Sequence, residues 1–543
     1  MSKVAHYLQE HLIGEVMTST DARRYFATDG SVLQIAPALV VYPRSENDVR
    51  KTARFSWQLA ERGRVIPITA RGAGTDQTGA AIGSGIMLVF PAHMNRILEL
   101  DTKSNNVTVE PGISYGKLQQ TLQTHGRFLP CYPPDLDYST IGGAIANNAS
   151  GEKSFKYGDT RAFVQGLRVV LANGEVIETG RLSKREFSKK LGLATFEGEI
   201  YRSIDTLIEE NHDLVDKMQR NVTLNSAGYD LMDIKRKDGS FDLTPLFVGS
   251  QATLAITTEA VLSTESYSPQ TTLLMAQFDS LEHTQNAIVE LREMSDTPSS
   301  IEIVDENVLQ QVEALNPNQL KEVIKAPYPA ITMLVEFDVD EKHAKKIIKK
   351  AEKIFDKYVV SSQVATDAEQ QQQLWKIRQS TSYLLAHNEG LVKSVPLVDA
   401  AVAPDRLKEY LEGLYALLEA NNIKPAIWGH AGDGNLVLQP RLNLGQVGDR
   451  QKAFRFMADY HKLVLSLGGT IAATSGEGRL RAPYLESMYG TEIYQLMQKV
   501  KNIFDPYGTL NPGVKFGTSM DDLKTMIRPD FTLDHVYDHL PRS

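Results

Sequence analysis

Residues 67–79 read P-I-T-A-R-G-A-G-T-D-Q-T-G and connect two apolar runs, residues 65–69 and 85–91, that we expect to be strands. Gly72, Gly74 and Gly79 lack Cβ atoms, so the backbone can turn sharply and approach a ligand closely. Successive backbone N–H groups in such a loop can converge on an anion. The segment therefore predicts a strand–loop–strand unit whose loop suits a diphosphate. An ordinary glycine-rich turn is the alternative when these residues are taken alone.

Two commoner nucleotide-binding loops do not fit the segment. A dinucleotide fingerprint needs G-x-G-x-x-G opening a helix, whereas these glycines have another spacing and a strand follows them. A Walker loop needs Lys and then Ser or Thr after its last glycine, where this chain has Ala80 and Ala81. Rossmann-type NAD binding and nucleotide hydrolysis are therefore disfavoured.

Three later segments share this small, hydrogen-bonding character. Residues 133–151 read P-P-D-L-D-Y-S-T-I-G-G-A-I-A-N-N-A-S-G, residues 249–259 read G-S-Q-A-T-L-A-I-T-T-E, and residues 510–513 read L-N-P-G. Their glycines allow close backbone approach, and their Ser, Thr and Asn side chains offer neutral hydrogen-bonding groups. The segments favour a ligand with a ribityl chain, a diphosphate or a polar ring edge.

Composition narrows the class of protein. A chain of 543 residues exceeds the size at which one core stops growing, so two or more domains are expected. The net charge of -9 argues against a nucleic-acid partner, and no apolar run predicts an integral membrane segment. Cys131 is the single cysteine, so this chain alone cannot build an iron–sulfur cluster. We expect a cytoplasmic protein, with peripheral contact at the inner face of the membrane left open.

The second half contains two similar strand–helix–strand units. The first covers residues 271–278, 281–294 and 300–304, and the second covers residues 330–337, 341–357 and 359–364. Two such units in succession predict a ferredoxin-like domain, in which helices back a single antiparallel sheet. A helix rich in Gln is expected to follow over residues 367–385.

Five motifs, taken in order, resemble those of the vanillyl-alcohol-oxidase superfamily with its PCMH-type FAD domain, in particular the glycolate oxidase, D-lactate dehydrogenase and D-2-hydroxyglutarate dehydrogenase branch. They are R-G-A-G-T, T-I-G-G-A-I-A-N-N-A-S-G, W-K-I-R, G-H-A-G-D-G-N-L and L-N-P-G. The resemblance covers nearly the whole chain and implies an α+β fold. A two-part PCMH-type FAD-binding domain is expected over residues 1–267, a ferredoxin-like substrate or cap domain over 268–465, and a segment returning to the first domain over 466–543.

The resemblance implies an FAD site built from the glycine-rich segments. Covalent relatives have a His within the diphosphate loop, where this chain has Gly74-Thr75-Asp76, so noncovalent FAD is expected. Cys131 lies two residues before Pro133, but a small buried thiol is its expected role. The residues assigned to cofactor binding are Arg71, Gly72, Ala73, Gly74, Thr75, Asp76, Gly79, Pro134, Asp135, Thr140, Ile141, Gly142, Gly143, Asn147, Ser150, Gly151, Tyr157, Gly158, Ile256 and Asn511.

Three residues are assigned to the substrate side. Arg378 in W-K-I-R resembles the family arginine that pairs with a substrate carboxylate, and a guanidinium matches a carboxylate with two hydrogen bonds; a surface helix arginine is the alternative. Lys393 resembles a family lysine near the substrate, with a solvated lysine as the alternative. His430 is the candidate base for the hydroxyl proton because histidine titrates near neutrality.

In the family, the histidine at 430 also helps to hold a divalent metal, usually zinc, with a second histidine and a downstream Glu-His pair. Here Val437 stands at the second position, and the downstream motif from Ser475 reads S-G-E-G-R-L-R, without its histidine. A stable zinc site normally wants at least three protein ligands. His430 and Glu477 give two, so a tight metal site is not expected.

These features predict an FAD-dependent dehydrogenase that oxidises a small D-2-hydroxy acid, of the lactate, glycolate or 2-hydroxyglutarate type, to the 2-keto acid. An FAD-dependent polyol or sugar oxidoreductase and a noncatalytic flavin-binding subunit of a larger complex are the alternatives. The electron acceptor stays open among a quinone, a carrier protein, a partner subunit and oxygen, as does a homo-oligomeric state.

Overall fold

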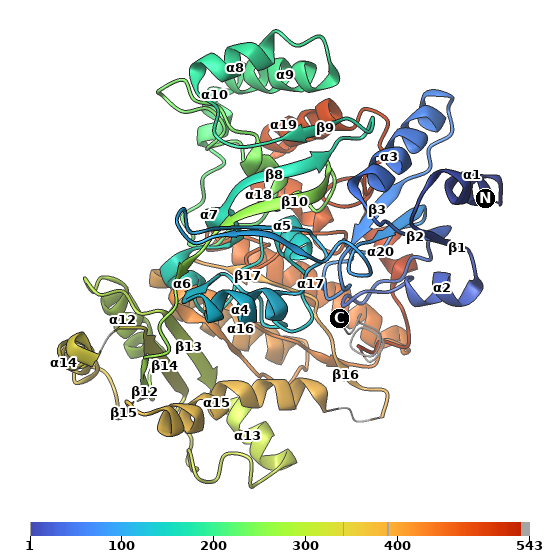
Figure 1. Cartoon of the computed structure of the whole chain (residues 1–543). Helices are drawn as coiled ribbons and strands as arrows, with labels where there is room; N and C mark the ends of the chain where they lie inside the picture. Colours follow the sequence, from blue (N-terminus) through green and yellow to red (C-terminus); the bar gives the residue numbers. More distant parts are fainter. Residues whose placement is uncertain (1, 340, 388–389, 534–543) are drawn as a thin grey trace.

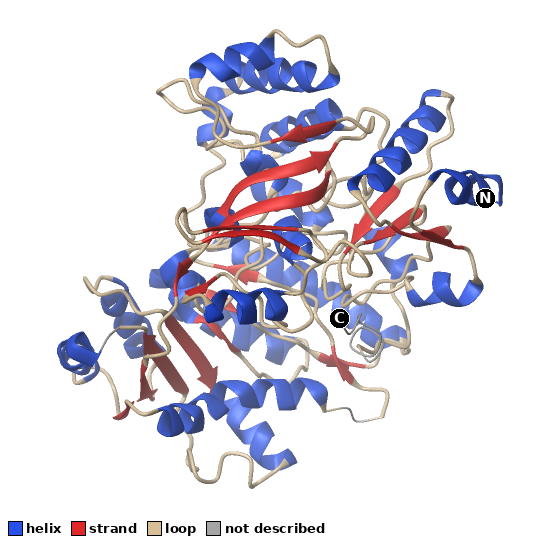
Figure 2. Ribbon diagram, in the orientation of Figure 1, coloured by secondary structure: helices blue, strands red, loops and turns tan. Residues whose placement is uncertain are grey.

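The computed structural model describes residues 2–339, 341–387 and 390–533. Three sheets of four or five strands dominate this part of the chain, and helices cover them (Figures 1 and 2). No helix in the described residues combines the length and apolar character needed to cross a bilayer. The mixed α+β character expected from the sequence is confirmed.

The first sheet holds the strands on either side of the glycine-rich loop. Its order is β1 (Glu15–Met17), β2 (Leu39–Tyr42), β4 (Ile86–Val89) and β3 (Ile68–Arg71). β4 runs parallel to both β2 and β3, and all four of its residues are buried. The chain leaves β3 through the loop and re-enters the sheet on β4, which confirms the predicted strand–loop–strand unit.

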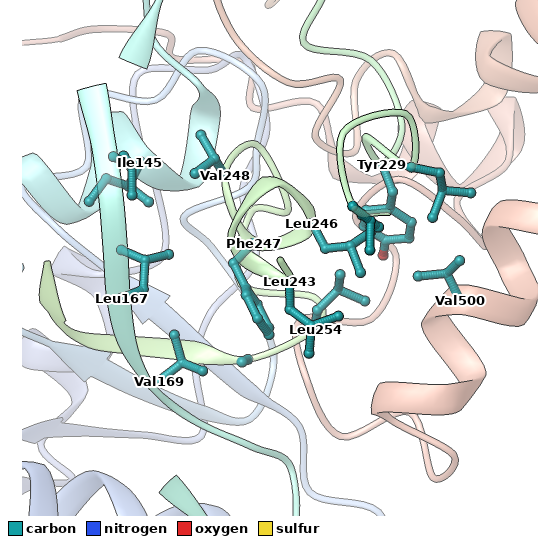
Figure 3. Packing of buried hydrophobic residues seen from close by; sticks show 14 of the residues in the cluster. Ile145, Leu167, Val169, Tyr229, Leu243, Leu246, Phe247, Val248, Leu254 and Val500 are labelled. Carbon is teal, nitrogen blue, oxygen red and sulfur yellow. The ribbon is translucent and has the colours of Figure 1, made fainter. Parts of the chain in front are cut away.

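The second sheet is antiparallel and forms the other part of the first half. Its order is β5 (Ile97–Asp101), β6 (Asn106–Val109), β10 (Ile256–Ser263), β8 (Val164–Val170) and β9 (Val176–Glu178). Buried and half-buried residues alternate along β10, as expected for a strand with one core face. Figure 3 shows Leu167 and Val169 of β8 beside Ile145, Phe247 and Leu254 in this core.

The third sheet has the order β15 (Ser361–Ala365), β12 (Thr272–Phe278), β14 (Ile331–Phe337), β13 (Ser300–Asp305) and β18 (Trp428–His430), and every pairing is antiparallel. Side chains of α12 (Leu281–Arg292) and α14 (Glu341–Phe355) pack with one face, and those of α13 (Glu306–Leu315) and α15 (Ala368–Ala386) with the other. In Figure 1 this sheet lies at the lower left, with α15 running below it. The ferredoxin-like arrangement is confirmed, with β18 added at one edge.

The remaining helices and strands complete the layers. The helices are α1 (Ser2–His11), α2 (Thr20–Tyr25), α3 (Glu46–Glu61), α4 (Tyr115–Thr124), α5 (Ile141–Asn147), α6 (Ser154–Tyr157), α7 (Thr160–Phe163), α8 (Lys184–Leu191), α9 (Phe196–Glu210), α10 (His212–Asp216), α11 (Thr244–Phe247), α16 (Leu407–Ala420), α17 (Val447–Ser466), α18 (Leu485–Tyr489), α19 (Thr491–Phe504) and α20 (Met520–Met526). Short 3-10 turns occur at Pro404–Arg406, Ala431–Asp433 and Ala482–Tyr484. The short strands are β7 (Arg127–Phe128), β11 (Glu265–Ser266), β16 (Lys393–Ser394), β17 (Ala400–Ala401), β19 (Asn435–Leu436) and β20 (Arg441–Leu442).

The last part of the chain returns to the first sheet. Ile68 of β3 forms a parallel bridge with Leu510, and its N–H donates to the carbonyl of Thr509 at 2.7 Å. Asn511 donates to the carbonyls of Ala80 and Gln251, both at 2.9 Å. Residues 509–511 therefore join the glycine-rich loop to the segment that precedes β10.

A buried ion pair fastens this returning segment. Lys515 and Glu477 have fully buried side chains, and their charged atoms lie 2.8 Å apart. Glu477 also accepts the N–H of Gly228, and Lys515 donates to the carbonyl of the same residue. Burial lowers the pKa of Lys515, while Glu477 opposes that shift. Removing one partner would leave the other charge buried without compensation.

Replacing Lys515 with Met should therefore lower the free energy of unfolding by about 3–5 kcal/mol, measured by urea denaturation. The double variant Lys515→Met/Glu477→Gln keeps an acceptor for Gly228 and should recover much of that loss. The control Lys524→Met breaks an exposed pair with Asp521 and should cost at most about 1 kcal/mol. Equal losses in the buried and exposed variants would contradict the role given to the buried pair.

Candidate active site

A cavity of about 630 Å³ lies where the loops of the first half meet the third sheet. Its lining comes from the glycine-rich loop, from residues 133–150, from residues 247–257 and from α15 and β18. The predicted cofactor side and the predicted substrate side therefore belong to one continuous space.

Most of the residues assigned from the sequence line this cavity. From the cofactor set they are Arg71, Gly72, Ala73, Gly74, Thr75, Asp76, Pro134, Asp135, Thr140, Gly142, Gly143, Asn147 and Ser150, and from the substrate set Arg378, Lys393 and His430. The assigned residues outside the lining are Gly79, Ile141, Gly151, Tyr157, Gly158, Ile256, Asn511 and Glu477.

Side-chain direction explains why several of these residues lie outside the lining. Ile141 and Ile256 point into hydrophobic clusters, and Ala255 and Thr257 line the cavity beside Ile256. The Tyr157 hydroxyl donates to Asp338, just after β14, so it ties the first half to the third sheet. These three residues pack behind the residues that line the cavity.

Three of the assigned glycines outside the lining stand where a side chain would clash or would strain the backbone. Gly151 approaches the carbonyl of Tyr132, where an added Cβ would lie 2.0 Å from the oxygen. Gly79 and Gly158 have φ of +76° and +91°, a region that favours glycine. All three therefore shape the turns beside the cavity, and they do not line it.

Asp76 organises the loop from within. Its carboxylate accepts the N–H groups of Thr78 at 3.0 Å and Ala80 at 2.8 Å, and it accepts the Asn147 amide at 3.0 Å. These bonds fold the loop back on itself and join it to α5. Asp76 lines the cavity, its assignment to cofactor binding stays a prediction, and its carboxylate bonds to the loop itself.

The glycine-rich loop packs closely against the Thr140 side chain at the cavity wall. A Cβ added to Gly72 would lie 2.2 Å from Oγ1 of Thr140, so only glycine fits without movement. Thr140 in turn accepts the N–H of Gly143 at 3.2 Å and caps α5. Gly74 has φ +82°, and a Cβ there would meet the guanidinium of Arg71 at 2.1 Å.

Buried positive charge surrounds this loop. Arg71 donates to the carbonyls of Thr28 and Ala81, Arg479 donates to that of Gly79, and Arg528 donates to that of Asp29. Burial lowers the pKa of Arg479 and of Arg528 to about 10, so both remain charged near neutrality.

The surrounding carboxylates do not cancel this charge. The two carboxylates near the loop belong to Asp76 and Asp29. Burial and the charge of Asp76 raise the pKa of Asp29 to about 6. Nε of Arg71 is buried without a hydrogen-bond partner among the described residues. An unpartnered cationic donor beside a glycine-rich cradle fits an anion such as the diphosphate of FAD.

A different cluster occupies the third-sheet side. Glu302 of β13 lies directly across from His430 of β18 in the antiparallel register. One carboxylate oxygen of Glu302 bonds Nδ1 of His430 at 2.6 Å, and the other accepts Nε–H of Arg378 on α15 at 2.7 Å. Glu302 is 1% exposed and does not line the cavity, whereas both of its partners do.

The charges in this cluster reinforce one another. Burial alone would raise the pKa of Glu302, but the charges of His430 and Arg378 hold it below its ordinary value. Burial alone would lower the pKa of His430, but the Glu302 carboxylate raises it. Arg378 also donates to Oγ1 of Thr381 at 3.0 Å. Glu302 is therefore an anion that holds the Arg378 guanidinium and the His430 imidazole at the cavity wall, and the imidazole is neutral above its raised pKa.

The donor set at this end does not fit a divalent metal. Val437 offers no ligand, one nitrogen of His430 is bonded to Glu302, and both oxygens of Glu477 are bonded by Lys515 and Gly228. Burial raises the pKa of Asp433 to about 7, and neither of its oxygens has a hydrogen-bond partner among the described residues. No group of three or more His, Cys, Asp or Glu side chains in the described residues is arranged for a metal.

Three features of the cavity were missed from the sequence. Glu302, which lies behind the lining, carries no motif signal, and neither do the lining residues Phe531, Thr532 and Leu533. Gln251 and Ala252 line it as well, inside the segment 249–259 that the sequence pointed to. Both have positive φ, 54° and 56°, and strained backbone of this kind gathers at binding sites. The sequence pattern pointed to the segment 249–259 as a whole, and Ile256 was the residue assigned to cofactor binding within it.

Cys131 is a buried thiol, as expected. It lies outside the cavity lining, and its sulfur is 3.3 Å from the hydroxyl of Tyr115. Burial raises the pKa of Cys131 to about 12, so the thiolate is scarce at neutral pH.

Two family models match the chain. One, described as an FAD binding domain, matches residues 37–180, and the other, described as the C-terminal domain of FAD linked oxidases, matches residues 268–514. The first covers the glycine-rich loop and the whole of residues 133–151. The second covers Glu302, Arg378, Lys393 and His430.

Curated relatives and a solved structure agree with these matches. D-2-hydroxyglutarate dehydrogenase of Escherichia coli is 31% identical over 93% of this chain and 50% of its own length. Glycolate oxidase subunit GlcD of Bacillus subtilis is 29% identical over 89% of this chain and 90% of its own length. The chain spans about half the length of the D-2-hydroxyglutarate dehydrogenases it matches.

The fold resembles p-cresol methylhydroxylase with substrate bound, with a TM-score of 0.68, 15% identity and coverage of 95% of this chain and 96% of that one. At this identity the likeness concerns the fold.

Gly72→Ala should weaken FAD binding about tenfold or more, because the new methyl group would push the loop away from Thr140. Gly448 on α17 has open space where a Cβ would lie, so Gly448→Ala is the matched control and should bind FAD normally. Quenching of FAD fluorescence during titration of the apoprotein measures both dissociation constants. Equal affinity of the two variants would contradict the close approach described above.

FAD affinity should fall as the pH rises from about 5 to about 7, because Asp29 loses its proton near pH 6 and adds a negative charge beside the loop. The sign follows from the raised pKa, since the protonated form persists in the folded protein below about pH 6 and is lost above it. Asp29→Asn should flatten this dependence in the same titration. An unchanged pH dependence in that variant would assign the effect to another group.

Proposed function

This chain belongs to the FAD-linked oxidases, and we propose that it is an FAD-dependent dehydrogenase that oxidises a small D-2-hydroxy acid to the corresponding 2-keto acid. One observation carries the proposal: Arg378 and His430 line the same cavity as the glycine-rich loop. A carboxylate anchor and a proton acceptor thus adjoin the cradle that fits the cofactor diphosphate. Relatives named for 2-hydroxyglutarate, lactate and glycolate support this substrate class.

Arg378 supplies the carboxylate anchor. Its Nε is bonded to Glu302, and the guanidinium still has donors for a substrate carboxylate, which matches its planar fork. Lys393 on β16 adds a second cation to the lining. We propose that this lysine assists Arg378, and that it meets the distal carboxylate when the substrate is a dicarboxylic acid.

His430 supplies the proton acceptor. Nδ1 is bonded to Glu302, and Nε2 has no hydrogen bond to any residue in the described part of the chain. The O–H bond of the substrate breaks with transfer of its proton to Nε2, and the carbonyl bond forms as the α-hydrogen leaves with its electron pair. FAD, when bound, accepts that hydride. The protein's own part is to bind, orient and deprotonate.

Reoxidation of the reduced flavin needs an electron acceptor, which none of the residues of the site provides. A single buried cysteine provides no iron–sulfur cluster, so we propose that electrons leave to a quinone, a carrier protein, a partner subunit or oxygen. The name of the B. subtilis relative, a glycolate oxidase subunit, supports a partner subunit as acceptor.

An anaerobic screen tests the proposed function directly. The FAD-loaded protein should lose its flavin absorbance with 2-hydroxy acids and keep it with glycerol or sorbitol. Arg378→Ala should raise the KM for the hydroxy acid about 100-fold, the loss expected for a charge-assisted pair. The exposed Arg236, which pairs with Asp233, gives the control variant Arg236→Ala with an unchanged KM.

The rival functions give different results. Turnover of polyols that is indifferent to Arg378→Ala would assign the protein to polyol oxidation. A yellow protein that no hydroxy acid or polyol reduces would be a flavin-binding subunit.

A further inference from the structure

Burying the Glu302 carboxylate has a cost in folding free energy. Glu302 is buried in the middle of β13 between Ile301 and Ile303, whose side chains belong to the core against α12. Burying a carboxylate carries a desolvation penalty that even a good ion pair often fails to repay, and apolar residues at such positions are frequently neutral or stabilising. A stability role alone therefore gives a weak account of this residue.

The Glu302 carboxylate connects two side chains that come from different secondary-structure elements. Arg378 comes from α15, and His430 comes from β18, more than fifty residues later in the chain. Each uses one oxygen of Glu302, at 2.7 and 2.6 Å. The planar carboxylate thereby fixes the spacing of the two side chains at the cavity wall.

We propose that Glu302 is the positioning residue that sets the distance between the carboxylate anchor and the base, and that this distance selects 2-hydroxy acids over 3-hydroxy acids. The inference rests on the proposed function. A 3-hydroxy acid carries its hydroxyl one carbon further from the carboxylate, so it cannot satisfy both Arg378 and His430 at a spacing set for the shorter substrate. Specificity for the position of the hydroxyl thus comes from a residue that does not line the cavity.

The same residue explains how the site orders itself without a divalent metal. Val437 and the Lys515-bound Glu477 leave too few free ligands for one, so the alignment of substrate must come from protein groups. Glu302 supplies this alignment by holding the base in one tautomer, with Nδ1–H donated to the carboxylate and Nε2 left to accept a proton. Dialysis against a chelator should leave the rate of reduction unchanged.

Three variants test the proposal. Glu302→Gln keeps the shape, but its NH₂ group opposes one of the two donors, so one partner is released. Glu302→Asp keeps the charge and withdraws it by one methylene. Thr381→Ala removes a hydrogen bond to Arg378 alone and leaves His430 untouched.

Two readouts separate the anchor from the base. Oxalate, a small dicarboxylate without a hydroxyl group, is titrated into the FAD-loaded protein and followed by flavin absorbance to report the anchor. The anaerobic rate constant of flavin reduction by lactate and by 3-hydroxybutyrate reports the base and the selectivity. Glu302→Gln should raise the oxalate Kd about tenfold, lower the lactate rate constant about 30-fold or more and shrink the lactate preference. Thr381→Ala should raise the oxalate Kd and leave the rate constant at saturation within about twofold.

A structural readout keeps the proposal independent of turnover. Nitrogen-15 NMR of histidine-labelled protein, recorded above the raised pKa of His430, should show its proton on Nδ1 in the wild type and a mixture of tautomers in Glu302→Gln. If wild-type protein is not reduced by any hydroxy acid, the proposed function fails, while the NMR and oxalate data still decide what Glu302 holds. If Glu302→Gln does not fold, Glu302→Asp carries the test through the same selectivity ratio. An unchanged ratio and an unchanged tautomer, or a rate that a chelator abolishes and zinc restores, would overturn the inference.

Discussion

The pairing of β18 with β13 is the constraint on which the candidate site depends. β18 is three residues long and comes from a part of the chain more than a hundred residues beyond β13. Its antiparallel register places His430 opposite Glu302, and that carboxylate then draws Arg378 from α15. A one-residue slip would turn the histidine to the other face of the sheet. The chemistry of the cavity therefore follows from backbone hydrogen bonding at a sheet edge.

Much of the architecture was predictable because local patterns carried it. Repeated strand–helix–strand periodicity gave the ferredoxin-like order of β12 to β15, and the glycine spacing gave the loop between β3 and β4. Both depend on residues that are neighbours in sequence. The family motifs likewise led to Arg378, Lys393 and His430, which all reach the same cavity.

What escaped prediction depends on contacts between distant segments. Glu302 stands in S-I-E-I-V-D, which gives the period of a buried strand and no hint that β18 will pair with it. Phe531 reaches the cavity because residues near it pair with the N-terminal part of the chain, as in the bridge between Leu33 and Ile527. Ile256 lies outside the cavity lining because its side chain belongs to the core, whereas its neighbours Ala255 and Thr257 line the cavity.

The return of residues 509–511 to β3 also bears on the order of events during synthesis. β3 and its loop leave the ribosome more than four hundred residues before Leu510, which forms the neighbouring bridge, and before Asn511, which holds Ala80 in place. Domains generally fold as units while the chain grows from its N-terminus. The partners of β3 and its loop at residues 509–511 are therefore available only after the chain has been synthesised as far as residue 511.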